Sequence, residues 1–513
     1  MEQAKTTSES VESHKGTPSA PIALPPDDGR TQRERLDRSL VHGVAWIGGV
    51  KWITQILAWI ATIVVARILT PADYGLVGYA TVFLGIVTLL SEFGIGTTIV
   101  AMRKLTDLHV AQINTLAVLF GAVGTVVCCA VAPLLAWYFR APELTLVVVV
   151  SSSVLFISSF RVVPQSLLQR DMRFRDLALN EGMQAVILAA GSVMFALMGF
   201  RYWTLVVSSV LSAVLSTLFA MRLVRVPLRW PDWAALGDAV RFSGQTIITR
   251  LTWYVYQNAD FVAAGRLLGR EALGAYSFAW NIASAPVERV TSLAGRVTPS
   301  ILSAVQNDLM ELRRYLLSVT EVLALIALPI TIGLALVAGD LVPLVLGEKW
   351  LSAIGPLQVL AVAASVRAIA PLFAQVLMVT GANHRTMQIN ILAVLLMPAA
   401  FVVGSMWGLS GIAAAWLTVY PTFVVLPLAL ITFRRLELRP TEYLRVLGPA
   451  AMAASVMLLT VLGVRAVTPF APSHLMAILR DVVVGGAAYV LTLFVFQRHR
   501  LRAIVSLMLR ARA

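Results

Sequence analysis

The stretch "ARILTPADYG" (residues 66–75) places an arginine, a proline, an aspartate and a glycine between two long apolar segments. A proline cannot continue a preceding helix, and glycine adopts turn conformations easily. We therefore predict a tight turn in which Pro71 ends one helix and Gly75 opens the next. Arg67 is placed to cap the C-terminal carbonyls of a helix.

A similar stretch, "GRLLGREALG" (265–274), returns later in the chain without a gap in the match. Both stretches lie between the first and second helices of a predicted set of six. An even number of helices in each set gives the two sets the same orientation, related by a pseudo-twofold axis along the membrane normal. The shared offset of 199 residues pairs Arg67 with Arg266, Gly75 with Gly274, Lys51 with Arg250, and Tyr79 with Phe278.

The composition points to a membrane protein, because 58% of the 513 residues are hydrophobic and only 13% are charged. Soluble domains are nearer one-quarter charged. The net charge of +14 suits cytoplasmic loops rich in Lys and Arg better than a nucleic-acid surface. Paired histidine or cysteine ligand spacings are absent, so we expect neither a metal site nor a cofactor.

The apolar runs are continuous over about 20 residues each, which favours membrane-spanning helices over β-barrel strands. The fold class is predicted as an all-α integral membrane protein with about 14 transmembrane helices. Their approximate spans are 42–66, 75–101, 112–138, 143–160, 182–200, 203–222, 242–264, 273–302, 318–338, 352–379, 387–406, 409–433, 444–465 and 478–497.

These spans divide the chain into two six-helix lobes and an additional C-terminal pair. We predict a disordered cytoplasmic tail, an N-terminal lobe, a C-terminal lobe, helices 13 and 14, and a basic cytoplasmic tail. Cations concentrate in every second loop, so the positive-inside rule places both termini in the cytoplasm. The five segments are residues 1–38, 39–225, 226–436, 437–497 and 498–513.

With its two six-helix sets, the chain over about residues 40–497 resembles the Wzx-type polysaccharide transporters, the oligosaccharide flippases of the multidrug/oligosaccharidyl-lipid/polysaccharide exporter superfamily. Besides the turn at 66–75, the matching motifs are "SEFGIGTTIV" (91–100), "VPQSLLQRDMRFRDLALNE" (163–181), "QNADFVAAGRLLGREALGAYSFAWNIASAP" (257–286) and "GANHRTMQINI" (381–391).

This resemblance implies a flippase rather than an enzyme. Its expected substrate is an undecaprenyl-diphosphate-linked oligosaccharide, moved by alternating access from the cytoplasmic to the periplasmic leaflet of a bacterial plasma (inner) membrane for exopolysaccharide, capsule or lipopolysaccharide synthesis. The expected partners are this lipid-linked oligosaccharide, membrane lipids, and the polymerase and export machinery of the same pathway. The long loop with "LLQRDMRFR" (167–175) is most similar to the colanic-acid and exopolysaccharide branch.

Charged residues inside apolar spans are costly and are therefore candidates for function. Cations suit a diphosphate, which accepts paired hydrogen bonds from arginine, and aromatic rings suit the faces of sugars. The candidates for substrate binding are Lys51, Arg250, Arg289, Arg296, Arg367, Trp253 and Tyr256, and those for ion coupling are Asp260, Glu92 and Glu288.

Structural alternatives remain open for these residues. Lys51 and Arg250 can extend towards lipid phosphates at the ends of their helices. Arg367 can pair with a glutamate of another helix, and Asp260 can serve as an interhelical hydrogen-bond partner. Trp253 and the neighbouring tyrosines can belong to an aromatic belt at the membrane interface.

Other functions fit the sequence less well. A drug/cation antiporter of the same superfamily is the principal alternative, but it calls for twelve helices and an acidic cavity. A polymerase or glycosyltransferase would need a large loop for its catalytic groups, and neither a P-loop nor a nucleophile with its base is present. A non-transporting structural protein would have little reason to keep so many charges within its spans.

Overall fold

The protein is a helical bundle in which the described residues form no β-strand. A computed structural model describes residues 53–92, 106–230, 251–306, 308–468 and 472–496. Helical segments that carry no label cover Ile53–Ile68 and residues 251–263. The labelled elements are α2 (Pro71–Glu92), α4 (Asp107–Phe139), α5 (Leu144–Arg170), α6 (Phe174–Leu197), α7 (Trp203–Leu223), η1 (Ala264–Leu268), α9 (Arg270–Ala304), α10 (Leu309–Val345), η2 (Glu348–Ala353), α11 (Ile354–Val379), α12 (Asn383–Gly404), η3 (Ser405–Trp407), α13 (Gly408–Tyr420), η4 (Pro421–Val425), α14 (Leu426–Arg435), α15 (Pro440–Val467) and α16 (His474–Phe496).

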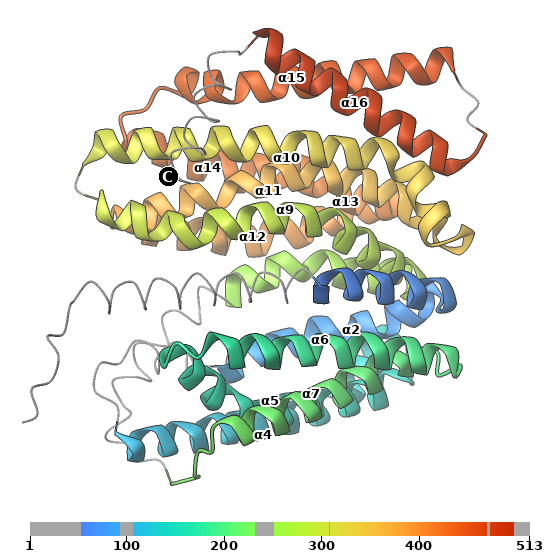
Figure 1. The fold of residues 1–513 in the computed structure, drawn as a ribbon, viewed down its shortest axis with the longest axis vertical. Coiled ribbons are helices and arrows are strands. Elements are labelled where there is room, and N and C mark those ends of the chain that lie inside the picture. Colours follow the sequence, from blue (N-terminus) through green and yellow to red (C-terminus); the bar gives the residue numbers. More distant parts are fainter. Residues whose placement is uncertain (1–52, 93–105, 231–250, 307, 469–471, 497–513) are drawn as a thin grey trace, which may run out of the picture.

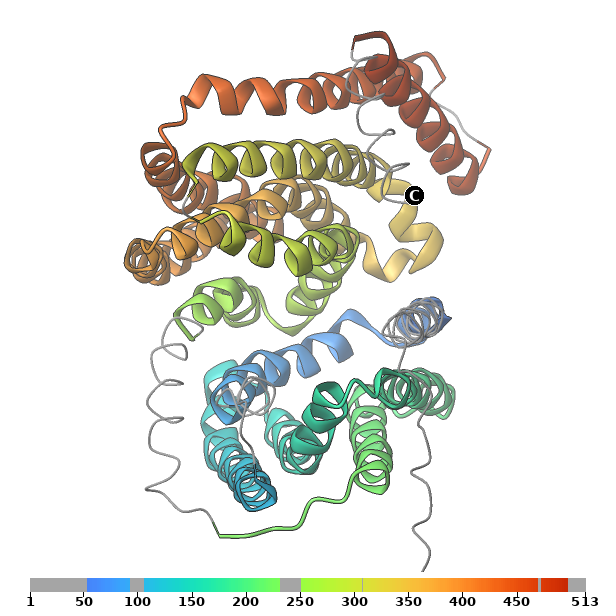
Figure 2. The same cartoon turned by 60° about the vertical axis from the view of Figure 1, so that its left-hand side comes forward.

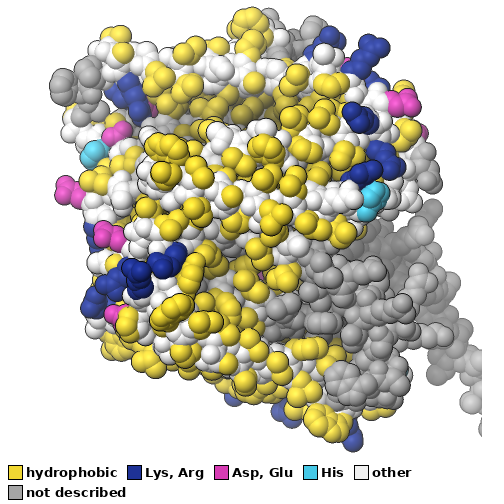
Figure 3. All heavy atoms as spheres, turned by 180° about the vertical axis from the view of Figure 1, so that it is seen from behind, with side chains coloured by type: hydrophobic (Ala, Val, Ile, Leu, Met, Phe, Trp, Pro, Cys, Tyr) yellow, Lys and Arg dark blue, Asp and Glu magenta, His cyan; other side chains and the backbone are white. Residues whose placement is uncertain are grey.

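The chain is a multi-pass membrane protein. Among the described residues, 10 helical segments are long and apolar enough to cross a membrane. Large apolar side chains such as Leu395, Trp407 and Val483 are exposed, as expected where lipid replaces water. Figure 3 shows hydrophobic side chains over the middle of one face, with charged side chains towards its two ends. The predicted all-helical membrane fold is confirmed, whereas the count of about 14 helices stays a prediction.

The helices gather in two groups along the long axis of the molecule. In Figures 1 and 2, α4 to α7 lie on one side together with α2, and α9 to α14 lie on the other. Within each group neighbouring helices pack on each other, as α4 does on α5 and α10 on α11, and α2 packs on α9 between the groups. The predicted boundaries of the lobes and their symmetry remain predictions.

The C-terminal pair α15 and α16 packs on the outer side of α10 (Figure 1). Arg465 of α15 donates to the carboxylate of Asp481 at 2.9 Å through Nε and to the Leu336 carbonyl of α10 at 2.7 Å. Near the middle of the pair, the Tyr489 hydroxyl donates to the Leu325 carbonyl at 2.8 Å. A buried carboxylate and a hydroxyl thus find partners inside the protein, as an apolar surrounding requires.

The turn at 66–75 differs from its prediction in one respect, because α2 begins at Pro71 and Gly75 lies inside it. Proline suits the first position of a helix, where its missing N–H is not needed. The Thr70 hydroxyl donates to Asp73 Oδ2 at 2.7 Å, and the Asp73 N–H donates to Thr70 Oγ1 at 3.3 Å. This reciprocal capping fixes the start of α2, so the prediction that Gly75 opens the helix was wrong.

Arg67 caps helix carbonyls as predicted, and these carbonyls belong to the distant helix α10. Its Nε donates to the Val345 carbonyl at 2.8 Å, and Lys349 donates to the Arg67 carbonyl at 2.6 Å. Arg270 pairs with Glu143 at 3.9 Å in the same region. The loops at 67–73, 140–143, 269–270 and 345–350 therefore share one end of the bundle, which we call the turn end.

Gly75 of α2 and Gly274 of α9 let the two helices touch at the turn end. A Cβ added at Gly75 would lie 1.7 Å from the Arg270 carbonyl oxygen, and one at Gly274 would lie 1.8 Å from the Pro71 carbonyl oxygen. Only glycine permits this approach. Pro71 and Arg270 are also 199 positions apart, so the contact is reciprocal, as twofold-related segments would make it.

Candidate functional site

A small cavity of about 150 Å³, with several polar side chains in its wall, lies inside the group formed by helix 251–263, α9, α11 and α13. Its wall combines the Arg367 guanidinium, the Glu288 carboxylate and the Gln257 amide with two aromatic rings, in a part of the chain that is otherwise apolar. Its polar and aromatic lining residues are Trp253, Gln257, Ser284, Glu288, Thr291, Arg367 and Tyr420.

Arg367 of α11 is held mainly by aromatic rings. Its guanidinium carbon lies 3.8 Å from the centre of the Trp280 ring and 5.5 Å from that of Trp416. Nη2 donates to Ser284 Oγ at a long 3.4 Å, and the buried Nη1 has no hydrogen-bond partner among the described residues. An arginine held by stacking keeps donors for a ligand, since ring contacts use none of its N–H groups.

Asp260 lies beside this arginine and is fully buried. Its carboxylate accepts hydrogen bonds from the Tyr276 hydroxyl and the Trp416 indole N–H, both at 2.8 Å, and from the Phe261 N–H at 2.9 Å. Three donors on one carboxylate fix its orientation.

Trp416 connects the two charges, because its indole N–H bonds Asp260 while its ring lies beside Arg367. Its ring centroid is 5.3 Å from that of Trp280 and 5.2 Å from that of Tyr420, one helical turn along the chain. Large, well-packed aromatic side chains have few rotamers to choose from. Trp280, Trp416 and Tyr420 therefore form a rigid aromatic frame that positions the charged groups.

The structure brings together three of the predicted site residues, since Trp253, Glu288 and Arg367 all line the cavity. Asp260 adjoins it through Trp416. Tyr256 is 3% exposed and lies in the core.

The other predicted residues lie elsewhere. Arg289 is exposed on α9 and does not line the cavity. The side chains of Arg296 on α9 and Glu92 on α2 are outside the described residues, as are Lys51 and Arg250 as a whole. Their roles stay predictions.

Sequence reasoning missed Gln257, Trp416 and Tyr420, which carry no charge. Gln257 stands one turn after Trp253 within an apolar span, and that spacing places both side chains on one helix face. Trp416 and Tyr420 have the same spacing, and each carries a donor that needs an acceptor in a dry surrounding. These two spacings were the signal in the sequence that could have identified the three residues.

We predict that Asp260→Asn lowers the free energy of unfolding by about 1–3 kcal/mol, because an amide nitrogen cannot accept the hydrogen bonds that a carboxylate oxygen accepts. Thermal unfolding of the purified protein in detergent measures the change. Glu271→Gln, at an exposed position of α9, is the control and should leave stability unchanged. An Asp260→Asn variant of normal stability would contradict this prediction.

Comparison with known proteins places the chain in a family. The family described as polysaccharide biosynthesis protein matches residues 64–355. This range covers more than half of the chain and includes α2, α9, most of the cavity and both arginines of the repeated turn.

Two curated relatives are similar over most of their length. The lipopolysaccharide biosynthesis protein WzxC of Escherichia coli (strain K12) is 26% identical over 75% of this chain and 79% of its own. The succinoglycan biosynthesis transport protein ExoT of Rhizobium meliloti (strain 1021) is 24% identical over 93% of this chain and 96% of its own.

A solved structure shares the fold. The lipid II flippase MurJ in an inward closed conformation superposes with a TM-score of 0.73, covering 89% of this chain and 99% of that chain, at 11% identity. At that identity the likeness shows the arrangement of helices alone.

Proposed function

The chain belongs to the polysaccharide biosynthesis protein family, and from this premise we propose that it is a flippase for undecaprenyl-diphosphate-linked oligosaccharide repeat units. It moves them from the cytoplasmic to the periplasmic leaflet of the bacterial inner membrane for exopolysaccharide, capsule or lipopolysaccharide synthesis. The printed roles of the relatives and the fold shared with a lipid flippase support this.

The observation that carries the proposal is Arg367, which lines a cavity with polar and aromatic side chains and has a buried Nη1 without a hydrogen-bond partner among the described residues. A phosphate oxygen is a strong acceptor for such a donor. Gln257 and Glu288 offer acceptors for sugar hydroxyls, and Trp253 offers an aromatic face. This combination suits an anionic sugar headgroup better than an apolar ligand.

We assign the diphosphate to Lys51 and Arg250, further headgroup contacts to Arg289 and Arg296, and a sugar contact to Tyr256, which lies in the core in this structure and would have to become accessible. Glu92, Asp260 and Glu288 are assigned to ion coupling. These assignments rest on the cost of charges within apolar spans.

Transport is proposed to proceed by alternating access between the lobes 39–225 and 226–436, which are related by a pseudo-twofold axis along the membrane normal. The reciprocal Gly75–Gly274 contact supports this arrangement, because it closes the turn end at a point where the repeat pairs the two helices. With both termini cytoplasmic, the turn end faces the periplasm. With the turn end closed, the substrate site is accessible from the cytoplasm.

The drug/cation antiporter of the same superfamily is less well supported. Glu288 supplies an acid to the cavity, but Arg367 lines it as well, and its charge would oppose a cationic drug. Polymerase and export proteins of the same pathway are the partners that we propose for the released product.

Deletion of the gene is expected to stop polymer output and to leave lipid-linked repeat units on the cytoplasmic leaflet. The units are mapped by their accessibility to an impermeant glycosidase in sealed vesicles of known orientation. Single units that accumulate on the periplasmic leaflet would indicate a polymerase and would contradict the proposal.

A further inference from the structure

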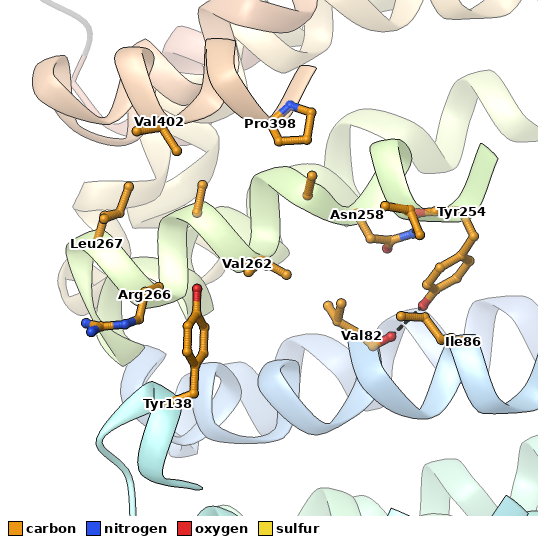
Figure 4. A pocket seen from close by; sticks show the side chains of 13 residues that line it. Val82, Ile86, Tyr138, Tyr254, Asn258, Val262, Arg266, Leu267, Pro398 and Val402 are labelled. Carbon is orange, nitrogen blue, oxygen red and sulfur yellow. Dashed lines mark hydrogen bonds between the residues drawn. The ribbon is translucent and has the colours of Figure 1, made fainter. Parts of the chain in front are cut away.

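A second cavity, of about 350 Å³, lies between the two helix groups and is mainly apolar (Figure 4). Val82 and Ile86 of α2 form one wall, helix 251–268 forms another, and α12 closes it with Pro398 and Val402. Leu267 and Val402 are 48% and 53% exposed, so the cavity opens sideways on a surface that faces lipid. We call it the lateral groove.

The groove is polar mainly at its turn end. There the Arg266 guanidinium carbon lies 5.3 Å from the centre of the Tyr138 ring, and both residues line the cavity (Figure 4). At the other end the Tyr254 hydroxyl donates to the Val82 carbonyl at 3.0 Å, and Asn258 Nδ2 donates to the Tyr254 carbonyl at 2.9 Å. Those two donors are occupied, and Arg266 supplies the positive charge at the turn end of the groove.

Tyr254 also closes the inner end of the groove. A Cβ added at Gly85 of α2 would lie 1.9 Å from the Tyr254 hydroxyl, so the ring rests directly on the α2 backbone. The helix from Tyr254 to Arg266 rises about 18 Å at 1.5 Å per residue. One leaflet of the hydrocarbon core is about 15 Å deep, so the groove has the length of one leaflet.

We propose that the lateral groove holds the prenyl chain of the lipid-linked substrate in the leaflet at the turn end, with the phosphate of that lipid at Arg266. This inference rests on the proposed function and adds a site for the apolar part of the substrate. A positive charge at the leaflet boundary above an apolar channel matches a lipid with an anionic head and an apolar tail.

The size of the groove favours one chain. Its volume of about 350 Å³ runs along the helix from Tyr254 to Arg266, so the groove is long and narrow. A narrow groove suits one extended chain, whereas a glycerophospholipid brings two chains side by side. The occupant in this proposal is a single-chain polyprenyl phosphate.

The direct test uses a polyprenyl phosphate with a diazirine in its chain, incorporated with the full-length protein in phosphatidylcholine nanodiscs. After illumination, mass spectrometry should find adducts on peptides that contain Val262, Leu267 and Val402. Unlabelled polyprenyl phosphate should remove these adducts, while neutral polyprenol of equal length should need about a tenfold higher concentration, the loss of one charge-assisted hydrogen bond. Dioleoylphosphatidylglycerol, which is anionic but has two chains, should not compete.

Matched variants test the charge of Arg266 and the open volume of the lateral groove separately. Arg266→Gln should weaken labelling about tenfold, while Arg270→Gln, which removes an exposed charge at the start of α9, should not. Val262→Trp should fill the groove and abolish labelling, with Leu395→Trp on the lipid-exposed face of α12 as control. Thermal unfolding checks that each variant folds, and Val402→Trp at the exposed rim replaces Val262→Trp if the latter does not.

Equal competition by phosphatidylglycerol, or adducts as frequent at Leu395 as in the groove, would overturn the inference. A translocation assay on the same nanodisc preparation after transfer to liposomes distinguishes a failure of this inference from a failure of the proposed function. Labelling without translocation would contradict the proposed function alone, and translocation without groove labelling would contradict this inference alone.

Discussion

Oxidation of a Gly78→Cys, Ser277→Cys variant is expected to reduce polymer export to the level of the deletion strain, and reduction is expected to restore it. A Cβ built on Gly78 of α2 lies 3.5 Å from Ser277 Oγ of α9, which is close enough for a disulfide. Residues 78 and 277 are again 199 positions apart. A bond there would hold the turn end closed, so alternating access could not proceed.

The experiment needs a background in which Cys128 and Cys129, both free, are replaced by alanine. The cross-link is scored on a non-reducing gel after protease cleavage at a site inserted between the two positions. The single variants, treated with the same oxidant, are the controls and should export normally. Complete cross-linking with undiminished export would show that the α2–α9 contact does not have to open.

Arg367→Gln is expected to lower the rate of oligosaccharide export by about 10- to 100-fold. The variant loses the charge-assisted hydrogen bonds that the free guanidinium donor offers to a phosphate, worth about 1.5–3 kcal/mol. Arg367→Lys keeps the charge but has no planar fork to stack on Trp280, so it should recover only part of the rate.

Two checks make this result specific. Arg385→Gln removes an exposed charge from α12 and should leave export unchanged. Protein level should be close to normal for Arg367→Gln, and thermal unfolding in detergent should show that the variant is folded, because the aromatic frame remains. Normal export by a folded Arg367→Gln variant would contradict the assigned role.

The membrane fold was readable from the sequence because each helix must satisfy its own backbone in lipid, which makes continuous apolar runs a strong signal. The repeated turn was readable for a different reason. Gly75 and Gly274 are needed for a contact in which any Cβ would strike a backbone carbonyl, so a constraint of the tertiary structure appears directly as two glycines. What was wrong was the start of α2, since Thr70 and Asp73 cap the helix before Gly75.

The candidate site was only partly predictable. Charges within apolar spans stand out, and this is why Arg367 and Glu288 were found. Gln257 and Tyr420 are uncharged, and their four-residue spacing from Trp253 and Trp416 is a weak signal, so it took the packing of α13 beside helix 251–263 to identify them. Arg266 was taken as a cation of the turn, because the sequence does not show that Tyr138 and an apolar channel lie beside it.

The most direct measurement of the central claim is translocation by the purified protein in liposomes. A fluorescent undecaprenyl-diphosphate oligosaccharide is placed in one leaflet, and its appearance in the other is followed by an impermeant quencher. The account predicts rapid equilibration with the wild-type protein, and little with Arg367→Gln or with the oxidised Gly78→Cys, Ser277→Cys variant. Equilibration no faster than in protein-free liposomes would contradict it.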